Sequence, residues 1–417
     1  MNVKDAGVKG DGTDDTKGLQ DLINNPVNYE TLIFPTGTYR IDKLRISRPM
    51  CFIGIGKVII TRQSSGSIVF GNNVDNVYLE NITFDGAFQP STMVWLNALK
   101  MTVRDCTFKN NGISGFSKGR NGPTDGLRMT GKEGMVDNCL FDGNERDGLL
   151  CGAVETLKIS NSKFNNNGRF ACANDGGLAA DYFPIYTQFI NNSSYNNGSG
   201  GFVCEGIKNK KFTVIEFTNN VIDSCGYDDW GYGSGLTAGI YTQGSMVGNT
   251  IKNFNANKKF VLSAITVNTN TGGITLLGNT FENCKGIVIN SIQNNSSSPI
   301  TITGNTFANC GTALNAYNHH NIIFNGNSLS KMEEHGLNID LCKNINIHGN
   351  SIMDCSSLEN GKYSGVYLSR SLYPSLTCNT INSSNQKYGI EASEVNTKSF
   401  IVGLNNIYQF VNAESNF

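Results

Sequence analysis

The stretches ITLLGNTFENCKG (274–286), ITITGNTFANCGT (300–312) and INIHGNSIMDC (345–355) are copies of one phrase. Each copy begins with an apolar alternation, continues through Asn and a small residue to an aromatic or aliphatic residue, and ends at Asn or Cys. Looser copies occur at 101–112, 134–144, 157–168 and 244–254. Alternation with a period of two indicates strands rather than helices. The repeat therefore predicts an array of short strands.

The spacing of the copies predicts how the strands are arranged. Consecutive copies lie roughly 20 to 35 residues apart, which is the range of solenoid repeats. The apolar positions that align are Phe108, Phe141, Phe164, Tyr195, Ile222, Ile251, Phe281, Phe307, Leu329, Ile352, Ile381 and Tyr408. Strands stacked about 4.8 Å apart with Gly and Asn at the corners describe a parallel β-helix. We therefore predict an all-β, right-handed parallel β-helix with a short N-terminal capping helix.

Most copies contain a second short strand that starts at a Gly. The residues one and three places after that Gly are predicted to face the core: Leu127/Met129, Leu149/Cys151, Leu178/Ala180, Phe202/Cys204, Ile287/Ile289, Leu337/Ile339, Val366/Leu368 and Ile390/Ala392. Residues two and four places after the Gly must then point outward. The Asn residues at the corners are predicted to take the left-handed conformation and to bond the neighbouring coil.

Composition excludes several classes of function. The chain has 417 residues, a net charge of −1 and only 16% charged residues. A nucleic-acid-binding face would be basic, and no apolar run approaches the length of a membrane span. No signal peptide is visible. The 12 cysteines contain no C-x-x-C pair, and several recur at one place in the repeat, so we predict reduced core residues and synthesis in a reducing cytoplasm.

The N-terminus differs from the repeats. Thr13 or Asp14 is predicted to cap a short helix whose apolar stripe is Leu19, Leu22 and Ile23. The segment TLIFPTGTYRID (31–42) is predicted to form a strand, a turn and a strand. We expect one domain, with residues 1–45 as a cap and residues 46–417 as coils, interrupted by a loop insertion near 226–235.

These N-terminal residues carry a resemblance. DAGVKGDGTDDTKGLQDLI (5–23) with LIFPTGTYRI (32–41) resembles the N-terminal signature of the pectate-lyase-like superfamily of right-handed β-helices. That superfamily includes phage tailspikes, capsule depolymerases, polygalacturonase-like hydrolases and mannuronan epimerases. The signature implies the fold, and it assigns no catalytic role to the residues that form it.

A second segment resembles mannuronan C5-epimerases more distantly. NDGGLAADYF (174–183) is similar to the strand that carries a catalytic-site Asp in those enzymes, which places Asp181 in that role. The preceding coil reads DGLLCGA (147–153), without the His and Tyr of the epimerase motif. The epimerase mechanism therefore lacks part of its residue set.

Outward-facing polar residues gather between residues 118 and 232. Asp125 and Asp147 precede the Gly of their coils, and Arg128 and Arg146 lie beside them. We predict Asp147 to be catalytic and Asp125, Arg128 and Arg146 to bind substrate. A solvated outer surface is the alternative.

Asp181 and Glu205 each lie four places after a Gly, at 177 and 201. Equivalent positions on successive coils are about 4.8 Å apart, and two carboxylates at that separation suit a retaining glycosidase. We therefore predict that both are catalytic. A calcium site or a solvated ladder is the alternative for this pair.

The loop CGYDDWGYGSG (225–235) interrupts the repeat. Trp230 and Tyr232 are predicted to stack on sugar rings, and Asp228 or Asp229 to act as an acid across a wider gap, as in inverting enzymes. A loop that packs on itself or on a neighbouring subunit is the alternative. The four histidines are scattered and are predicted to lie at the surface.

Three readings of function stay open at this point. The first, which the resemblance favours, is a tailspike-like depolymerase that binds and cleaves capsule or O-antigen, more in the manner of a glycoside hydrolase than of a lyase. The second is a lyase or C5-epimerase acting on a uronate polymer, and the third is a non-catalytic glycan-binding or fibre module. No metal site and no cofactor is required, although calcium would suit a lyase or epimerase. The resemblance implies a homotrimer that acts outside the cell, as a component of a virion tail, with no nucleic-acid partner and no insertion into a membrane.

Overall fold

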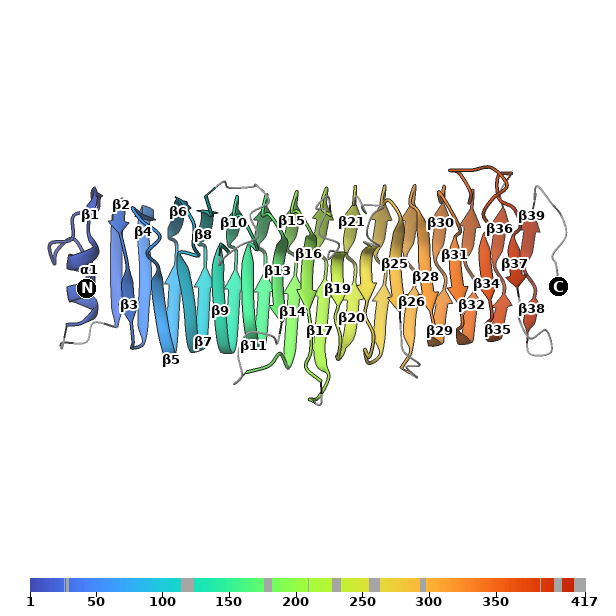
Figure 1. Ribbon diagram of the computed structural model, residues 1–417, viewed down its shortest axis with the longest axis horizontal. Helices are drawn as coiled ribbons and strands as arrows, with labels where there is room; N and C mark the ends of the chain where they lie inside the picture. The colour runs from blue at the N-terminus through green and yellow to red at the C-terminus, as the bar shows by residue number, and fades with distance from the viewer. Residues whose placement is uncertain are drawn as a thin grey trace. The chain divides into compact units, whose positions relative to one another are not determined.

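The computed structural model describes residues 1–25, 27, 30–113, 124–175, 182–208, 210–226, 234–254, 263–292, 298–382, 384–393 and 400–408. The chain divides into two compact units, Met1–Val203 and Cys204–Phe417. Each unit is a parallel β-solenoid (Figure 1), and the described part of the chain contains one short helix, α1 (Thr16–Ile23). The predicted fold class is thus confirmed, while the predicted division at residue 45 stays a prediction.

The strands of the first unit pair in parallel with their neighbours one coil away. They are β1 (Asp11–Asp14), β2 (Thr31–Ile41), β3 (Leu44–Ile46), β4 (Met50–Arg62), β5 (Ile68–Glu80), β6 (Thr83–Gln89), β7 (Val94–Arg104), β8 (Thr107–Asn111), β9 (Leu127–Asp137), β10 (Leu140–Asp142), β11 (Leu149–Ser160), β12 (Lys163–Asn165), β13 (Phe170–Asp175), β14 (Tyr186–Ile190), β15 (Ser193–Tyr195) and β16 (Gly200–Cys204), the last of which ends at the boundary. Strand β11 is long because residues 149–152 pair with β13 and residues 156–160 pair with β14.

Aromatic rings stack along the core of the first unit. Phe84, Phe108, Phe141 and Phe164 lie in register on β6, β8, β10 and β12, with successive ring centroids 5.1, 5.2 and 4.6 Å apart. The predicted alignment is wrong at Tyr195, because Phe164 pairs with Ser194 and the side chain of Tyr195 is exposed. A slip of one residue reverses the face on which a strand side chain lies.

The N-terminal segment departs from the prediction in two ways. Helix α1 buries Leu19, Leu22 and Ile23 as expected, but its N-cap is Asp15 rather than Thr13 or Asp14. The carboxylate of Asp15 accepts hydrogen bonds from the backbone N–H groups of residues 9 and 10, so it ties the preceding loop rather than the helix. Residues 31–41 form one continuous strand with an irregularity between residues 35 and 37, not two strands.

The second unit repeats a coil of three strands. Its strands are β17 (Thr213–Thr218), β18 (Val221–Asp223), β19 (Ser234–Ala238), β20 (Thr242–Val247), β21 (Thr250–Lys252), β22 (Ser263–Val267), β23 (Ile274–Leu277), β24 (Thr280–Glu282), β25 (Ile287–Ile292), β26 (Ile300–Thr303), β27 (Thr306–Ala308), β28 (Thr312–Tyr317), β29 (His320–Asn325), β30 (Ser328–Ser330), β31 (Leu337–Asp340), β32 (Lys343–His348), β33 (Ser351–Met353), β34 (Val366–Ser369), β35 (Leu372–Thr377), β36 (Thr380–Asn382), β37 (Ile390–Ser393), β38 (Ile401–Gly403) and β39 (Asn406–Tyr408). Every third strand pairs with its equivalent one coil away, so equivalent residues form columns.

The predicted columns of the second unit are largely correct. Strands β18, β21, β24, β27, β30, β33 and β36 bury Ile222, Ile251, Phe281, Phe307, Leu329, Ile352 and Ile381 in register. Tyr408 was misaligned, because Ile407 is the partner of Ile381. The cysteines at residues 225, 284, 310 and 355 are buried thiols, as predicted. Ten of the twelve cysteines in the chain are buried in all, Cys51 is half-buried and Cys378 is exposed.

A ladder of buried Asn side chains links the coils. Asn279 is 1% exposed, and its Oδ1 accepts from the backbone N–H and the Nδ2 of Asn249, both at 2.9 Å. Its Nδ2 donates to the Met246 carbonyl and to Asn305 Oδ1, both at 2.9 Å. The ladder runs through Asn220, Asn249, Asn279, Asn305, Asn327, Asn350, Asn379 and Asn405 in this unit, and through Asn111, Asn144, Asn167 and Asn197 in the first.

A second set of Asn residues confirms the predicted corners. Asn166 and Asn196 have φ values of 53°, and Asn196 Nδ2 donates to Asn166 Oδ1 at 2.8 Å. These residues lie directly before the ladder residues Asn167 and Asn197. The corner conformation and the buried ladder therefore belong to neighbouring residues in the chain.

Removing one rung of the ladder should destabilise the second unit. In Asn279→Ala, the backbone N–H and the side-chain amide of Asn249 and the Met246 carbonyl lose partners inside the protein, and each buried unsatisfied group costs about 1–3 kcal/mol. We expect the free energy of unfolding, measured by urea denaturation, to fall by about 3 kcal/mol. Asn346→Ala, at an exposed strand position, should change it by less than about 0.5 kcal/mol. Equal effects of the two substitutions would contradict this prediction.

His319 lies inside the second unit, contrary to the predicted surface position. It is 2% exposed, its Nδ1 lies 2.7 Å from the His320 carbonyl oxygen, and its backbone N–H donates to Cys342 Sγ at 3.4 Å. Burial disfavours the charged imidazolium and lowers the pKa of His319 from 6.5 to about 4. The folded protein therefore holds this side chain neutral at a pH where the unfolded chain is protonated.

This difference makes stability depend on pH. Between pH 6.5 and about 4 the unfolded state binds more protons at His319 than the folded state, so the free energy of unfolding should fall as pH falls, by up to about 3 kcal/mol. In His319→Asn, the free energy of unfolding, measured by denaturation at several pH values in this range, should lose that part of its dependence on pH. His348→Asn, at an exposed position, should keep it. A slope that His319→Asn leaves intact would refute the assignment.

Candidate functional site

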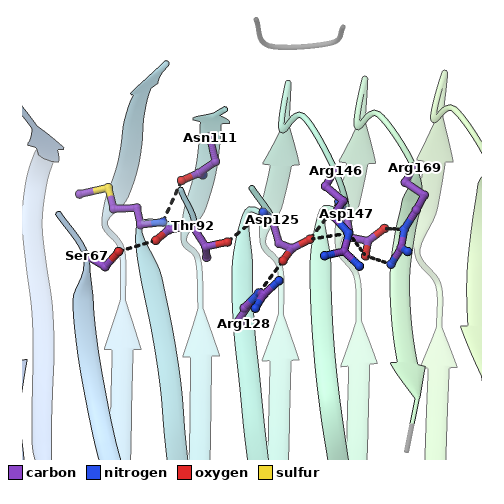
Figure 2. A network of polar contacts seen from close by, with 9 residues as sticks. Ser67, Thr92, Asn111, Asp125, Arg128, Arg146, Asp147 and Arg169 are labelled. Atoms are coloured by element: carbon purple, nitrogen blue, oxygen red, sulfur yellow. Dashed lines mark hydrogen bonds and ion pairs between the residues drawn. The ribbon is translucent and has the colours of Figure 1, made fainter. Parts of the chain in front are cut away.

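The candidate site starts at the turn that precedes the second strand of each coil. Thr92, Asp125 and Asp147 occupy this turn on three successive coils, ahead of β7, β9 and β11 (Figure 2). Thr92 Oγ1 accepts the backbone N–H of Asp125 at 2.9 Å, and Asp125 Oδ1 accepts that of Asp147 at 3.3 Å. Asp147 Oδ1 in turn accepts the backbone N–H of Phe170 at 3.0 Å. Each side chain therefore caps a backbone donor of the next coil.

Arginines surround the two carboxylates of this turn. Arg128 Nε lies 2.6 Å from Asp125 Oδ2, and Arg169 Nε donates to Asp147 Oδ1 at 2.7 Å. Arg146 Nε lies between the two acids, 3.8 Å from Asp125 Oδ1 and 4.0 Å from Asp147 Oδ2. The carboxylates are completely buried, whereas the arginine side chains are 21–26% exposed. The order of charges along the coils is cation, anion, cation, anion, cation (Figure 2).

Burial and proximity shift the pKa values in this network. Burial, with the adjacent charge of Asp147, raises the pKa of Asp125, although Arg128 and Arg146 act in the opposite direction. Burial alone would lower the pKa of Arg169, but the charge of Asp147 and the hydrogen bonds to it outweigh burial and raise the pKa. Arg169 is therefore firmly cationic, and Asp147 is its counter-charge.

A groove adjoins the network on the outward face of β5, β7, β9 and β11. It has a volume of about 430 Å³ and is lined by Val69, Phe70, Gly71, Trp95, Leu96, Asn97, Arg128, Met129, Thr130, Leu150 and Gly152. The inward residues among these contribute backbone, because their side chains lie in the core. Trp95 pairs with Arg128 across β7 and β9, and the guanidinium carbon lies 4.9 Å from the centre of the indole ring. Arg128 thus links the buried network to the groove.

One carboxylate adjoins the groove from the next coil. Asp175 ends β13 and pairs with Gly152, and Gly152 lines the groove. Asp175 interacts electrostatically with Arg169. The groove therefore combines an aromatic ring, hydroxyl and amide groups, a guanidinium and a nearby carboxylate, a set of groups that suits a polar ligand with apolar faces.

The structure brings together four of the predicted residues, but not as predicted. The expectation that Asp125 and Asp147 face outward is wrong, because both side chains are 0% exposed and bond the backbone of the next coil. Arg128 does face outward and lines the groove, and Arg146 is partly exposed beside it. The predicted catalytic role of Asp147 and the predicted binding roles of the other three stay predictions.

Glu205 follows β16 at the start of the second unit and is half-buried. A side chain at Gly239 would collide with its Cγ, so Gly239 leaves the room that Glu205 occupies. Asp181, Asp228, Asp229, Trp230 and Tyr232 lie outside the described residues. The predicted pairing of Asp181 with Glu205 and the predicted sugar-stacking loop therefore stay predictions.

Among the described residues, no three His, Cys, Asp or Glu side chains gather closely enough to hold a metal ion. In the same part of the chain, no helix has the length and apolar character needed to cross a membrane. Calcium dependence stays a prediction tied to residues such as Asp181.

Sequence reasoning missed several residues of the site. Trp95, Asn97, Thr130 and Asp175 lie at outward strand positions, and Arg169 precedes β13. The coil that contains Trp95 lacks the Gly used to number the second strands, because residues 92–94 read TMV. Trp95 could have been found by aligning its strand with the strand of Arg128, because the two residues are partners in the register.

Two family models match the chain. Residues 1–179 match "Rhamnogalacturonase A/epimerase, pectate lyase-like", and residues 274–407 match "Right handed beta helix region". The first match contains the groove and the network. The predicted resemblance to pectate-lyase-like right-handed β-helices is thereby confirmed.

Curated relatives are similar over part of the chain. Alginate lyase 7 of Azotobacter vinelandii is 29% identical over 213 residues, which cover 48% of this chain and 23% of the relative. A capsule K30/K69-specific depolymerase of Klebsiella phage K64-1 is 29% identical over 188 residues, which cover 41% of this chain and 22% of the relative. The matched regions thus span less than a quarter of either relative.

Solved structures share the fold. The catalytic unit of a GH87 alpha-1,3-glucanase from Streptomyces thermodiastaticus superposes with a TM-score of 0.57 at 13% identity, covering 96% of this chain and 70% of the other. The tailspike of Escherichia coli bacteriophage HK620, solved with a pentasaccharide, superposes with a TM-score of 0.50 at 13% identity, covering 96% and 79%. At this identity the likeness establishes the β-helix and nothing finer.

Neutralising Asp147 should destabilise the first unit. Asp147→Asn keeps an acceptor for the Phe170 N–H but removes the counter-charge of Arg169, and breaking a buried ion pair costs about 3 kcal/mol or more. We expect that loss in the free energy of unfolding. Asp21→Asn breaks an ion pair at the surface, in which the Asp21 side chain is 62% exposed and the Lys17 side chain is 90% exposed. It should lower the free energy of unfolding by less than about 0.5 kcal/mol. A similar small cost for Asp147→Asn would show that the buried pair contributes little.

Proposed function

We propose that the protein binds and cleaves a bacterial surface polysaccharide in the groove of its first unit. The observation that carries the proposal is the groove of about 430 Å³, with Arg128 on its wall and Asp175 adjoining it. Its position on the outward face of neighbouring coils suits a long chain laid along the solenoid. The curated relatives, an alginate lyase and a capsule depolymerase by name, support a polysaccharide substrate.

Glycoside hydrolysis is the chemistry we favour. It needs two carboxyl groups flanking the scissile bond, and Asp175 is the described carboxylate that adjoins the groove. Asp175 also interacts electrostatically with Arg169, whose guanidinium is bonded to Asp147. We therefore assign Asp175 the role of nucleophile or general base. The predicted Asp181 is the candidate for the acid.

A lyase or C5-epimerase acting on uronates is the second candidate, and Arg146 favours it. Within the described residues its guanidinium makes no hydrogen bond, and both carboxylates near it lie 3.8 Å or more away. Its donors are therefore available to the carboxylate of a uronic acid, whose charge must be neutralised before a proton can leave the adjacent carbon. A non-catalytic glycan-binding module is the third candidate.

The setting in which the protein works is part of the proposal. We propose a homotrimer that acts outside the cell as a component of a virion tail, by analogy with the named depolymerase and tailspike. Binding of the polysaccharide does not require a membrane or nucleic acid in this scheme. Analytical ultracentrifugation gives the oligomeric state directly.

Incubation with purified K30 or K69 capsule, or with alginate, tests the proposed activity. We expect new reducing ends, and we expect Asp175→Asn to lower kcat by at least about 100-fold, as for a residue that transfers protons or attacks the substrate. Absorbance in the ultraviolet from an unsaturated uronate product would identify a lyase instead. Asp21→Asn, at an exposed position of helix α1, is the matched control. Full activity of Asp175→Asn would remove that residue from the mechanism, and no product from either polymer would count against cleavage.

A further inference from the structure

Two polar atoms in the groove have no hydrogen-bond partner among the described residues. They are Trp95 Nε1, which can only donate, and Asn97 Oδ1, which can only accept. Both atoms are shielded from solvent, and both residues line the groove. The two residues lie two places apart on β7, so their side chains project from the same face of the strand.

Unpartnered buried groups are costly in a folded protein. A buried donor or acceptor left without a partner costs about the desolvation of that group, and nearly all such groups in folded proteins are paired. The turns and corners around the groove follow that rule closely, as the Asn111–Asn144 contact at 2.9 Å and the capped N–H groups of Asp125 and Asp147 show. Other buried atoms without a partner among the described residues occur at Arg48, Ser291, Asn325 and Gln386, outside the groove. Trp95 and Asn97 differ from these because they place an unpaired donor and an unpaired acceptor together on one groove wall.

The surroundings hold the Trp95 side chain in place. The indole ring of Trp95 packs against the guanidinium of Arg128 at 4.9 Å, and Arg128 is anchored by Asp125 at 2.6 Å. Asn97 pairs with Thr130 across β7 and β9. Because the ring is fixed in this way, the direction of its N–H group is set before any ligand arrives.

We propose that Trp95 Nε1 and Asn97 Oδ1 recognise two neighbouring hydroxyl groups of one sugar ring. Side chains two places apart on a strand lie next to each other on the same face, so neighbouring hydroxyl groups of one ring can meet them in turn. One hydroxyl accepts from the indole N–H and the next donates to the amide oxygen. The inference rests on the proposed function, and it adds that this subsite reads the hydroxyl pattern of the polymer.

Such a subsite discriminates strongly. A pocket built to bond a hydroxyl rejects a deoxy sugar because its own buried groups are then left unpaired. Loss of either contact should weaken binding of the matching polysaccharide about 10-fold. Arg128, on the same wall, adds a cation but no hydroxyl pattern, so it contributes affinity more than selectivity.

Two substitutions test the assignment with little risk to the fold. Trp95→Phe keeps an aromatic ring against Arg128 but removes the N–H, and Asn97→Leu keeps the volume but removes the oxygen. Since each removes an unpaired buried group, the melting temperature of the ligand-free protein should rise or stay the same. Affinity for K30 or K69 capsule or alginate, measured by affinity electrophoresis, should fall about 10-fold in each. Asn346→Leu, on an exposed strand position, is the matched control.

The chain has 2 Trp residues, which allows a direct view of the donor. In protein labelled with ¹⁵N at tryptophan, the indole resonance that is missing from Trp95→Phe belongs to Trp95. Adding the bound polysaccharide, or an oligosaccharide cut from it, should move that resonance downfield as its proton enters a hydrogen bond. A resonance that does not move would overturn the inference.

The outcomes separate this inference from the proposed function. Binding that Trp95→Phe and Asn97→Leu both leave intact overturns the subsite while cleavage still stands. Binding that depends on both residues, without any product, supports the subsite and contradicts the proposed cleavage. Absence of wild-type binding to both polymers contradicts the two together.

Discussion

Hydrogen bonding between one coil and the next is the constraint on which this structure depends. A parallel solenoid exposes backbone donors and acceptors at each turn, and each must be met by the adjacent coil because water is excluded there. Asn279 meets two such groups, the Asn249 N–H and the Met246 carbonyl, through a 1% exposed side chain that also bonds the amides of Asn249 and Asn305. The same requirement explains why Asn recurs at this place in both units, since an amide can donate to one neighbour and accept from the other.

The charged network follows from the same constraint at a different turn. At the turn before the second strand, the side chains of Thr92, Asp125 and Asp147 each accept a backbone N–H from the next coil of the first unit. In the second unit His335 Nδ1 accepts the N–H of Ser364 at 3.0 Å in the same way. Where that acceptor is a carboxylate, its buried charge requires a cation, and Arg128, which pairs with Asp125, also reaches the outward face. A structural need thus places a guanidinium at the groove.

The core columns could be predicted from the sequence, whereas the residues of the candidate site could not. The inward columns were predictable because every second residue of a strand faces the core and is apolar. The error at Tyr195 arose because Ser194 stands where other coils have an aromatic or aliphatic residue. The position of Asp125 was misjudged because a carboxylate beside Gly resembles an exposed turn, and nothing local shows that it caps a donor 22 residues further along the chain. The groove was missed because its residues meet only through register across coils.

The unpaired atoms at Trp95 and Asn97 have meaning because of this background. Outward strand positions carry no requirement from the fold, so a small polar residue would satisfy the solenoid there as well as Trp or Asn does. At the turns of the first unit, backbone N–H groups are bonded by side chains at 2.9–3.3 Å. In the groove, Trp95 Nε1 and Asn97 Oδ1 are shielded from solvent and have no hydrogen-bond partner among the described residues. Stability alone would favour Phe and Leu at these places. The retained N–H and amide oxygen therefore point to a requirement that lies outside the fold, in what the groove binds.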